Sequence, residues 1–129
     1  MATIVNIPVL ENAKVLVVED AYFIASDLAR ALHEAGARPV GPAGTVAQAS
    51  ALLAEQEVDA AILDLNLRGD MAVPFVEQLS NLGVPCIIVS GYGPDSLPES
   101  IRGLPSLEKP VNYSRVMECL AAQLASRTT

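Results

Sequence analysis

The sequence is short of several residue types, and each shortage narrows the range of functions. It has one histidine, His33, and two cysteines, Cys86 and Cys119. The histidine lies within an expected helix, so the sequence offers no Ser-His-Asp arrangement of a hydrolase. The cysteines have neither metal-ligand nor CxxC spacing, and we interpret them as reduced packing residues.

Basic residues and long apolar runs are also scarce. Lys and Arg number 8 against 15 Asp and Glu, the net charge is −7, and no basic cluster occurs, which argues against direct nucleic-acid binding. No apolar run approaches the roughly 18 residues of a membrane span, and no signal peptide opens the chain. We therefore expect a cytoplasmic protein without membrane insertion. A length of 129 residues, 51% of them hydrophobic, indicates one domain with a buried core.

What the sequence does contain is an alternation of short apolar runs and helical stretches, which is typical of βαβ units and a parallel sheet. The expected strands are 14–18, 38–41, 60–63, 86–89 and 106–108, and the expected helices are 21–35, 46–56, 72–82 and 112–126. Four Gly and Pro residues between 94 and 105 leave room only for a short helix around 99–102.

Local signals support several of these boundaries. Gly36 is suited to a left-handed helix stop, and Pro39 marks its strand as an edge. Thr45 followed by Gln48 predicts a capping box. Asn112 is a favourable N-cap for the last helix.

The predicted fold is α/β: a flavodoxin-like (βα)5, doubly wound, five-stranded parallel sheet in the order 2-1-3-4-5, with a shortened fourth helix. Polar residues stand where its strands end. Glu19 and Asp20 follow the first strand, Asp64 the third, Ser90 the fourth and Lys109 the fifth. Because the carboxyl ends of parallel strands share one edge, and the order reverses between strands one and three, the three acids should meet there.

These residues suit phosphoryl chemistry. Three carboxylates in one crevice repel one another and need a cation, and hard oxygen ligands suit Mg²⁺. Lys109 supplies a fixed positive charge and Ser90 a hydroxyl donor, which together form a cradle for a phosphoryl group. An ionised Asp64 is a nucleophile that needs no base. Each residue also has a simpler interpretation: a loop aspartate, a helix cap at Glu19–Asp20, a turn serine or a surface lysine.

The chain resembles a response-regulator receiver domain of two-component signalling from Lys14 to about Leu124. The resemblance implies that Asp64 is the phospho-acceptor. It implies that Asp20 binds Mg²⁺ directly and Glu19 acts through water, with the backbone carbonyl of Asn66 as a further ligand. It further implies that Ser90 hydrogen-bonds the phosphoryl group, that Lys109 pairs with it, and that the bond between Lys109 and Pro110 is cis.

The chain departs from the common receiver pattern in two places. Ser106 occupies the position of the usual aromatic switch residue, and the fourth helix is short. Tyr92, two residues after Ser90, is our candidate for a substitute switch. The runs 90–93 and 69–75 resemble a subgroup of receivers, common in alphaproteobacteria, in which the fourth helix is rebuilt.

The resemblance implies a stand-alone receiver. It would accept a phosphoryl group from a histidine kinase or histidine phosphotransfer protein, with Mg²⁺ as cofactor. It would then signal to an unknown downstream protein by contact, or act as a phosphate shuttle or sink. It would catalyse its own phosphorylation and dephosphorylation without turning over an external substrate. The alternative is a degenerate receiver that serves as a phosphorylation-independent scaffold, and dimerisation stays open.

Two further classes fit less well. An aspartate-nucleophile phosphatase usually carries a general acid two residues after the nucleophile, where this chain has Asn66. A nucleotide- or flavin-binding domain needs a Gly-rich first turn, whereas residues 19–22 are acidic. We divide the chain into an N-terminal extension at 1–12, a receiver domain at 13–126 and a tail at 127–129. The extension has β character, and disorder, an added strand or packing on a second copy all remain open.

Overall fold

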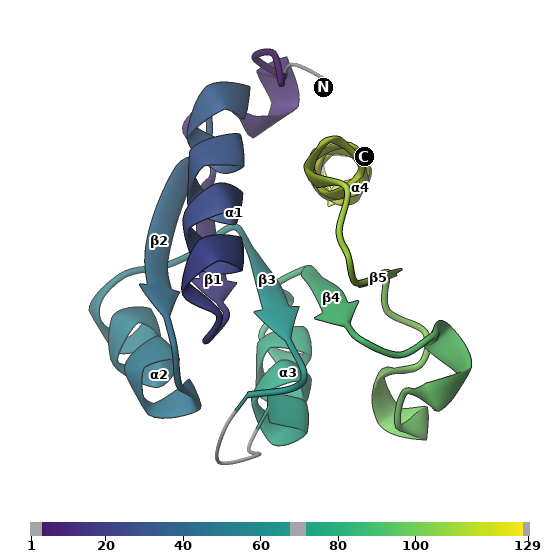
Figure 1. Cartoon of the computed structure of the whole chain (residues 1–129). Coiled ribbons are helices and arrows are strands. Elements are labelled where there is room, and N and C mark those ends of the chain that lie inside the picture. Colours follow the sequence, from purple (N-terminus) through teal and green to yellow (C-terminus); the bar gives the residue numbers. More distant parts are fainter. Residues whose placement is uncertain (1–3, 68–71, 128–129) are drawn as a thin grey trace.

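The computed structural model describes residues 4–67 and 72–127, and Figure 1 shows their arrangement. The strands are β1 (Lys14–Val18), β2 (Arg38–Ala43), β3 (Ala60–Asp64), β4 (Cys86–Ser90) and β5 (Ser106–Glu108). The α-helices are α1 (Tyr22–Ala35), α2 (Val46–Glu55), α3 (Ala72–Asn81) and α4 (Tyr113–Arg127). Three short 3-10 helices complete the described elements: η1 (Pro8–Leu10), η2 (Pro94–Ser96) and η3 (Glu99–Ile101).

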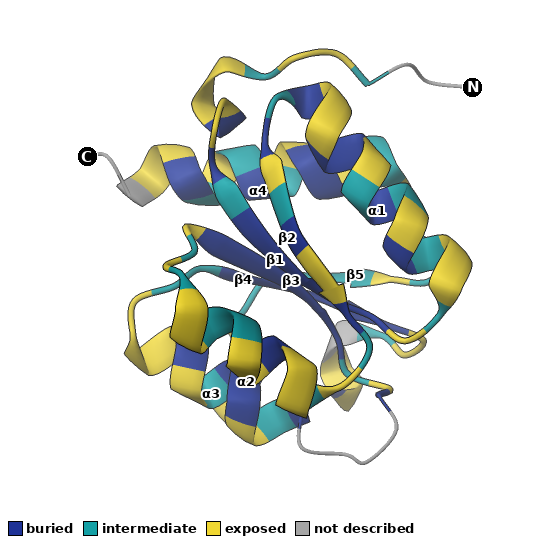
Figure 2. Ribbon diagram, turned by 90° about the vertical axis from the view of Figure 1, so that its left-hand side faces the viewer, coloured by how far each residue is buried: buried dark blue, intermediate teal, exposed yellow. Residues whose placement is uncertain are grey.

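The five strands form one parallel sheet in the order β2-β1-β3-β4-β5, which confirms the predicted fold. Helices α1 and α4 cover one face of the sheet, and α2 and α3 cover the other (Figure 2). The three central strands are buried on both faces, which is why they consist of continuous apolar runs rather than alternating ones.

Each face of the sheet has its own apolar core. The core beneath α1 and α4 includes Leu28, Leu32, Ile87 and Leu120, and the core over α2 and α3 includes Phe75, Leu79 and Ile88. Cys86 belongs to the second core; it is free, and burial raises the pKa of its thiol to about 12. A thiol with so high a pKa suits the packing role expected of it.

The local signals in the sequence are confirmed with two refinements. Gly36 ends α1 with φ of +98°, and Asn112 caps α4 by accepting from the Arg115 N–H at 3.2 Å. Thr45 caps α2 by accepting from the Gln48 N–H at 3.1 Å, but the Gln48 side chain accepts from the N–H of Gly44 instead of Thr45. The edge strand β2 also continues two residues beyond the predicted end, to Ala43.

Between β4 and β5 the chain forms η2 and η3 instead of a long helix, as the Gly and Pro residues predicted. Leu97 and Ile101 are 3% and 1% exposed and enter the core over α3. The Arg102 guanidinium donates to the Leu97 carbonyl from Nε at 3.3 Å and from Nη2 at 3.1 Å. The segment is therefore packed against the domain by the side chains of Leu97 and Ile101, and the Arg102 side chain stabilises its backbone.

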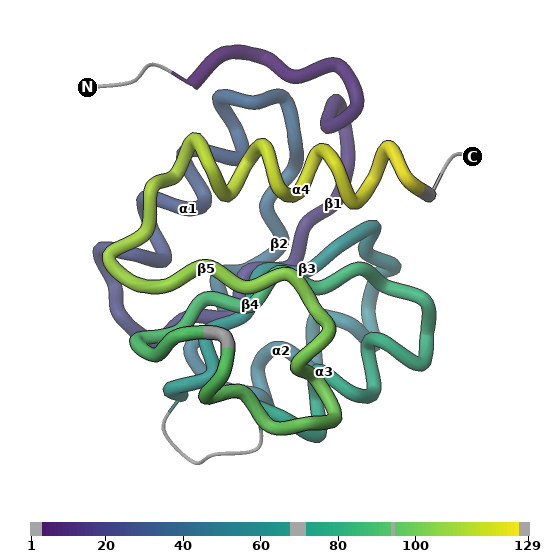
Figure 3. The backbone as a smooth tube through the Cα atoms, turned by 90° about the vertical axis from the view of Figure 1, so that its right-hand side faces the viewer, coloured from purple at the N-terminus to yellow at the C-terminus, as the bar shows by residue number. Residues whose placement is uncertain are grey.

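The described part of the N-terminal extension packs on its own domain. Residues 4–7 run beside α4, across the top of the molecule in Figure 3, and lead into η1 and β1. They add no strand to the sheet, and Leu10 is completely buried in the core beneath α1 and α4. Residues 1–3 of the extension, 128–129 of the tail and 68–71, which include the start of the run 69–75, lie outside the described residues.

No helix among the described residues is long and apolar enough to span a membrane.

Candidate functional site

Three of the candidate residues share an uncommon property. Among the described residues, the buried polar or charged side chains are Glu19, Asp64 and Ser90, at 3%, 2% and 2% exposure. Buried carboxylates are rare unless they are paired or bind a cation. Their coincidence at one edge of the sheet therefore marks a site rather than a packing feature.

Strand register brings these residues together. Val18 lies opposite Leu63, so Glu19 comes level with Asp64, and Asp64 in turn lies opposite Val89, one residue before Ser90. The Glu19 N–H donates to the Ala43 carbonyl at 2.9 Å, which extends the sheet pairing past the end of β1.

Lys109 spans the two buried carboxylates. Its Nζ lies 3.0 Å from Oδ2 of Asp64 and 3.1 Å from Oε1 of Glu19, and its side chain is 22% exposed. The Lys109 N–H donates to the Ser90 carbonyl at 2.7 Å, and the peptide bond to Pro110 is cis. Burial lowers the pKa of Lys109, but its hydrogen bonds and charge pairing with Asp64 and Glu19 outweigh burial and raise the pKa overall. The ammonium is thus charged at any physiological pH.

Backbone amides hold the remaining carboxylate oxygens. The Ala21 N–H donates to Oε2 of Glu19 at 3.0 Å, and the Asn66 N–H donates to Oδ1 of Asp64 at 2.9 Å. Oε1 of Glu19 has its ion pair with Lys109 but no well-directed hydrogen bond within the described residues. Both carboxylates are therefore fixed in place, although Oε1 of Glu19 lacks a hydrogen bond from the described residues.

Two buried carboxylates side by side disfavour double ionisation. Burial, followed by a hydrogen bond to Asp64, raises the pKa of Glu19 to about 7, against the opposing effects of the Ala21 N–H and Lys109. One lysine is thus too little positive charge for this group of acids. A divalent cation would supply the rest.

The donor set fits Mg²⁺. Glu19, Asp20 and Asp64 each offer a carboxylate oxygen, and these oxygens lie within 4.8 Å of one another. Asp20 is exposed while the other two are buried, so the site is open to solvent on one side. Magnesium favours such a site, because it binds a few carboxylates and keeps several waters.

Asp20 is not the cap of α1. The N-cap position belongs to Ala21, without a side-chain hydrogen bond, and the Glu19 carboxylate reaches the Ala21 N–H instead. The helix-cap interpretation of Asp20 was therefore wrong, and its carboxylate remains available on the open side of the acid cluster.

Ser90 is oriented by the loop that follows it. Its Oγ accepts from the Tyr92 N–H at 3.1 Å, which leaves the hydroxyl proton free to donate elsewhere. Tyr92 is 64% exposed, and Ser106 in β5 is half-buried. Asn66 is exposed, and its side-chain amide nitrogen lies 3.6 Å from where a Cβ at Gly91 would stand.

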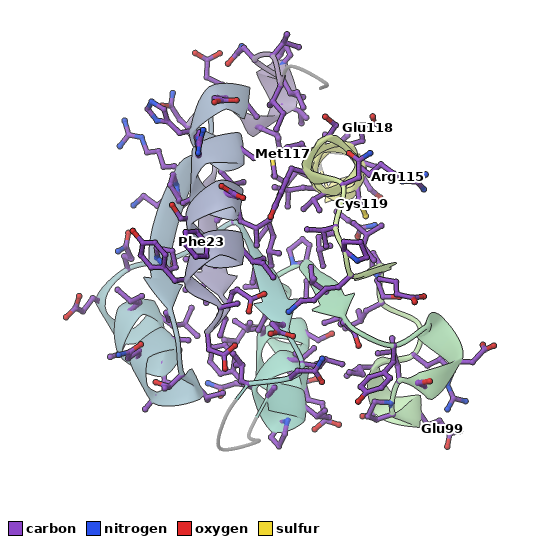
Figure 4. All side chains as sticks on the ribbon, in the orientation of Figure 1. Phe23, Glu99, Arg115, Met117, Glu118 and Cys119 are labelled. Atoms are coloured by element: carbon purple, nitrogen blue, oxygen red, sulfur yellow. The ribbon has the colours of Figure 1, made fainter. Side chains whose placement is uncertain are left out.

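An aromatic pair next to the site was missed in the sequence. Tyr22 and Phe23 open α1, are 76% and 79% exposed, and meet edge to face with ring centroids 5.4 Å apart. Phe23 projects from α1 on the side away from α4 (Figure 4). Two adjacent aromatics directly after the acidic pair, in a chain with 4% aromatics, are the signal that could have revealed them.

The site also continues toward α4 through Tyr113, which the sequence reading did not single out. Burial, then the charge of Asp27 on α1 and a hydrogen bond to it, raises the pKa of the Tyr113 hydroxyl, and the charge of Glu19 adds to the shift. Tyr113 therefore stands between α1 and α4, within electrostatic reach of the buried acids.

Comparison with known proteins identifies the family of the chain. The pattern of the response regulator receiver domain family matches residues 15–120. The chain therefore belongs to the response regulator receiver domain family of two-component signalling. No curated protein shows significant sequence similarity to it.

Solved structures similar to the chain include receivers of several organisms. The solution structure of SdrG from Sphingomonas melonis Fr1 is 38% identical, with a TM-score of 0.75 over 88% of this chain and 97% of that chain. A CheY-like receiver domain protein from Methanospirillum hungatei JF-1 is 23% identical, with a TM-score of 0.80 over 92% of this chain and 98% of that chain.

The response regulator PhyR from Brucella abortus is 23% identical, with a TM-score of 0.79 over 93% of this chain. The match covers 51% of that chain, so this chain spans about half the length of PhyR. At 23% identity, the last two likenesses show the shared fold alone.

Proposed function

We propose that this receiver accepts a phosphoryl group from a phosphohistidine onto Asp64 and loses it again by hydrolysis, with Mg²⁺ as cofactor. The observation that supports this most is the buried Asp64 carboxylate, held by Lys109 at 3.0 Å beside the acidic pair Glu19 and Asp20. A structural ion pair would not need two further acids, whereas a phosphoryl-transfer site does.

The transfer assigns a role to each residue. A carboxylate oxygen of Asp64 attacks phosphorus, the bond between phosphorus and the donor imidazole nitrogen breaks, and its electron pair returns to that nitrogen. Lys109 pairs with the developing negative charge, and Ser90 donates its hydroxyl proton to a phosphoryl oxygen. Asp20 would bind Mg²⁺ directly, Glu19 through water, and Asp64 and the Asn66 carbonyl would complete the ligands. Bound Mg²⁺ would neutralise charge on the phosphoryl oxygens.

The phosphorylated form would signal through contacts with another protein. Phosphorylation adds about −1.5 to −2 charge and three acceptor oxygens beside Ser90. Because the Ser90 hydroxyl also accepts from the Tyr92 N–H, a shift of Ser90 toward the phosphoryl group would pull on the loop that carries Tyr92. This proposal gives Tyr92 the switch role that Ser106 cannot fill.

Acetyl phosphate with Mg²⁺ tests the proposal. The intact mass of the protein should rise by one phosphoryl group, and the rise should disappear with EDTA. If the mass does not rise, Mg²⁺ binding measured by calorimetry separates two explanations. Binding would point to a receiver that requires a protein donor, and the absence of binding would contradict the proposed chemistry.

The alternative is a phosphorylation-independent scaffold. Ser106 in place of an aromatic switch residue, together with the short 3-10 helices between β4 and β5, favours it. The acid cluster with its lysine counter-charge argues against it, since a scaffold would gain nothing from buried carboxylates.

Membership of the alphaproteobacterial subgroup of receivers remains a prediction.

Affinity for Mg²⁺ should depend on pH. Since the pKa of Glu19 is raised to about 7, a proton competes with the cation below that pH and no longer does above it. We expect the apparent affinity to rise about tenfold between pH 6 and pH 8. Titration calorimetry at both values measures it, with Glu19→Gln as the control that should flatten the dependence. Equal affinity of the wild type at the two values would contradict the assignment.

Docking of a protein donor should depend on Tyr22 and Phe23. Exposed aromatic side chains beside a reactive centre are suited to a protein interface, because each buries a large area at little cost in side-chain entropy. We expect the double change to alanine to slow phosphotransfer from a phosphorylated histidine phosphotransfer protein by about tenfold or more. Phosphorylation by acetyl phosphate should be unaffected.

The control for docking is Leu82→Ala. Leu82 is 63% exposed and follows α3 at the opposite edge of the sheet, so its removal should change neither rate. Equal slowing with acetyl phosphate and with the protein donor would show that the aromatic pair acts on the chemistry and not on docking.

A further inference from the structure

Residues 4–13, which we call the strap, precede the segment that matches the family, residues 15–120. Backbone hydrogen bonds tie the strap to the end of α1 and the start of β2. The Ile7 N–H donates to the Ala35 carbonyl at 2.9 Å, and the Asn12 N–H donates to the Gly36 carbonyl at 2.8 Å. The Ala13 carbonyl accepts from the Arg38 N–H at 2.7 Å. The strap thus satisfies two carbonyls that the end of α1 leaves without partners.

Apolar side chains anchor the strap more deeply. Leu10 is completely buried, and Ile4 and Ile7 are half-buried against the same core, while Val5 is 66% exposed. A Cβ at Gly36 would collide with Oδ1 of Asn6. The strap therefore follows a defined path in contact with the domain.

Helix α4 packs against this strap. It contacts α1, η1 and β4. Met117 points from α4 toward α1, whereas Arg115 and Glu118 point away from the core (Figure 4). Leu10 shares its core with Leu120 of α4, so the strap packs against the helix together with α1 and the sheet.

Helix α4 in turn is connected to the site. It begins at Tyr113, four residues after Lys109, and the intervening Val111 packs on the same core as the strap. The acids instead lie on the central strands: Glu19 directly follows β1, and Asp64 is the last residue of β3. Loss of the strap should therefore disturb the lysine side of the site and spare the metal side.

We propose that the strap is a clamp that holds α4 against α1 and, through α4, positions Lys109 at Asp64. Ile7 and Leu10 are its positioning residues. The part that concerns Lys109 rests on the proposed function, since it assumes that Asp64 is phosphorylated. The part that concerns α4 does not.

Two variants and one control test the clamp. Leu10→Ala removes the deep anchor, Ile7→Ala removes a shallower one in case the first fails to fold, and Val5→Ala changes an exposed strap residue. Hydrogen exchange of the α4 amides should accelerate about tenfold or more in the two anchor variants, and not in the control. The amides of α2 and α3 should keep their wild-type protection at the same temperature.

Activity separates clamping from simple stability. Well below the unfolding temperature, the rate of phosphorylation by acetyl phosphate should fall about fivefold in Ile7→Ala, because Lys109 is less well placed. Affinity for Mg²⁺ should remain that of the wild type. A variant that is only less stable would show neither the loss of rate nor this split.

Wild-type protection of α4 in both anchor variants would overturn the proposal. Faster exchange of α4 with an unchanged phosphorylation rate would overturn the link to Lys109. If wild-type protein accepts no phosphoryl group at all, the proposed function fails instead, and the exchange experiment still decides whether the strap holds α4.

Discussion

Asp64→Asn should abolish the incorporation of a phosphoryl group from acetyl phosphate and Mg²⁺. Asp64 is 2% exposed, and its two oxygens are held by the Asn66 N–H and by Lys109. The amide of asparagine has nearly the same shape but lacks the anionic nucleophile, so the reaction loses its acceptor while the packing survives. Intact mass spectrometry after incubation measures the effect, and the variant should keep the mass of the unmodified chain.

The matched control is Asp95→Asn. Asp95 is an exposed aspartate in η2, outside the acid cluster, and its variant should gain the same mass as the wild type. Retention of the modification in Asp64→Asn would mean that another residue is the acceptor, and the proposed chemistry would then be wrong.

Lys109→Met should slow the same reaction by about 10²- to 10³-fold, the effect of losing one preorganised charge from a transition state. Its ammonium lies 3.0 Å from Asp64 and 3.1 Å from Glu19. Affinity for Mg²⁺ should stay equal or rise, because a positive charge beside the ligands is removed. Time courses of phosphorylation at saturating Mg²⁺, together with calorimetry, separate the two effects.

Lys14→Met is the control for the lost lysine. Lys14 is the other lysine of the sequence and is the first residue of β1, at the opposite end of that strand from Glu19. Its variant should therefore react at the wild-type rate. A Lys109→Met variant that reacts at that rate would remove the lysine from the chemistry.

The fold was predictable because its signals are local and redundant. The central strands are short apolar runs. A run such as Cys-Ile-Ile-Val in β4 is typical of a parallel strand that is buried on both faces. The Gly and Pro residues between β4 and β5 excluded a long helix there. Parallel order and handedness then left few topologies.

Boundaries and side-chain partners were less predictable. Thr45 capped α2 as expected, but the Gln48 side chain reached Gly44, a choice that depends on the backbone path before the helix. Similarly, aspartate is a favoured N-cap residue, yet Ala21 and not Asp20 occupies the N-cap position of α1. The Ala21 N–H donates to the Glu19 carboxylate. Propensity identifies the residues that can cap a helix, but it does not determine at which residue the helix begins.

The location of the candidate site was predictable from the order of the strands. Residues that follow parallel strands lie at the same edge of the sheet, whatever the conformation of their side chains. The path of the strap could not be predicted in this way. Its contacts depend on the gap between α1 and α4, which no local pattern in residues 4–13 encodes. Burial of Leu10 is a tertiary property, and the sequence shows only that it is apolar.

The position of the phosphoryl group in the chain can be determined chemically. Wild-type protein would be phosphorylated with acetyl phosphate and Mg²⁺, reduced with borohydride, which converts an aspartyl phosphate to homoserine, and digested for peptide mass spectrometry. If Asp64 is the acceptor, homoserine should appear at position 64 in the Mg²⁺ sample and not in the sample with EDTA. Aspartate at position 64 in protein that carries a phosphoryl group elsewhere would contradict that assignment.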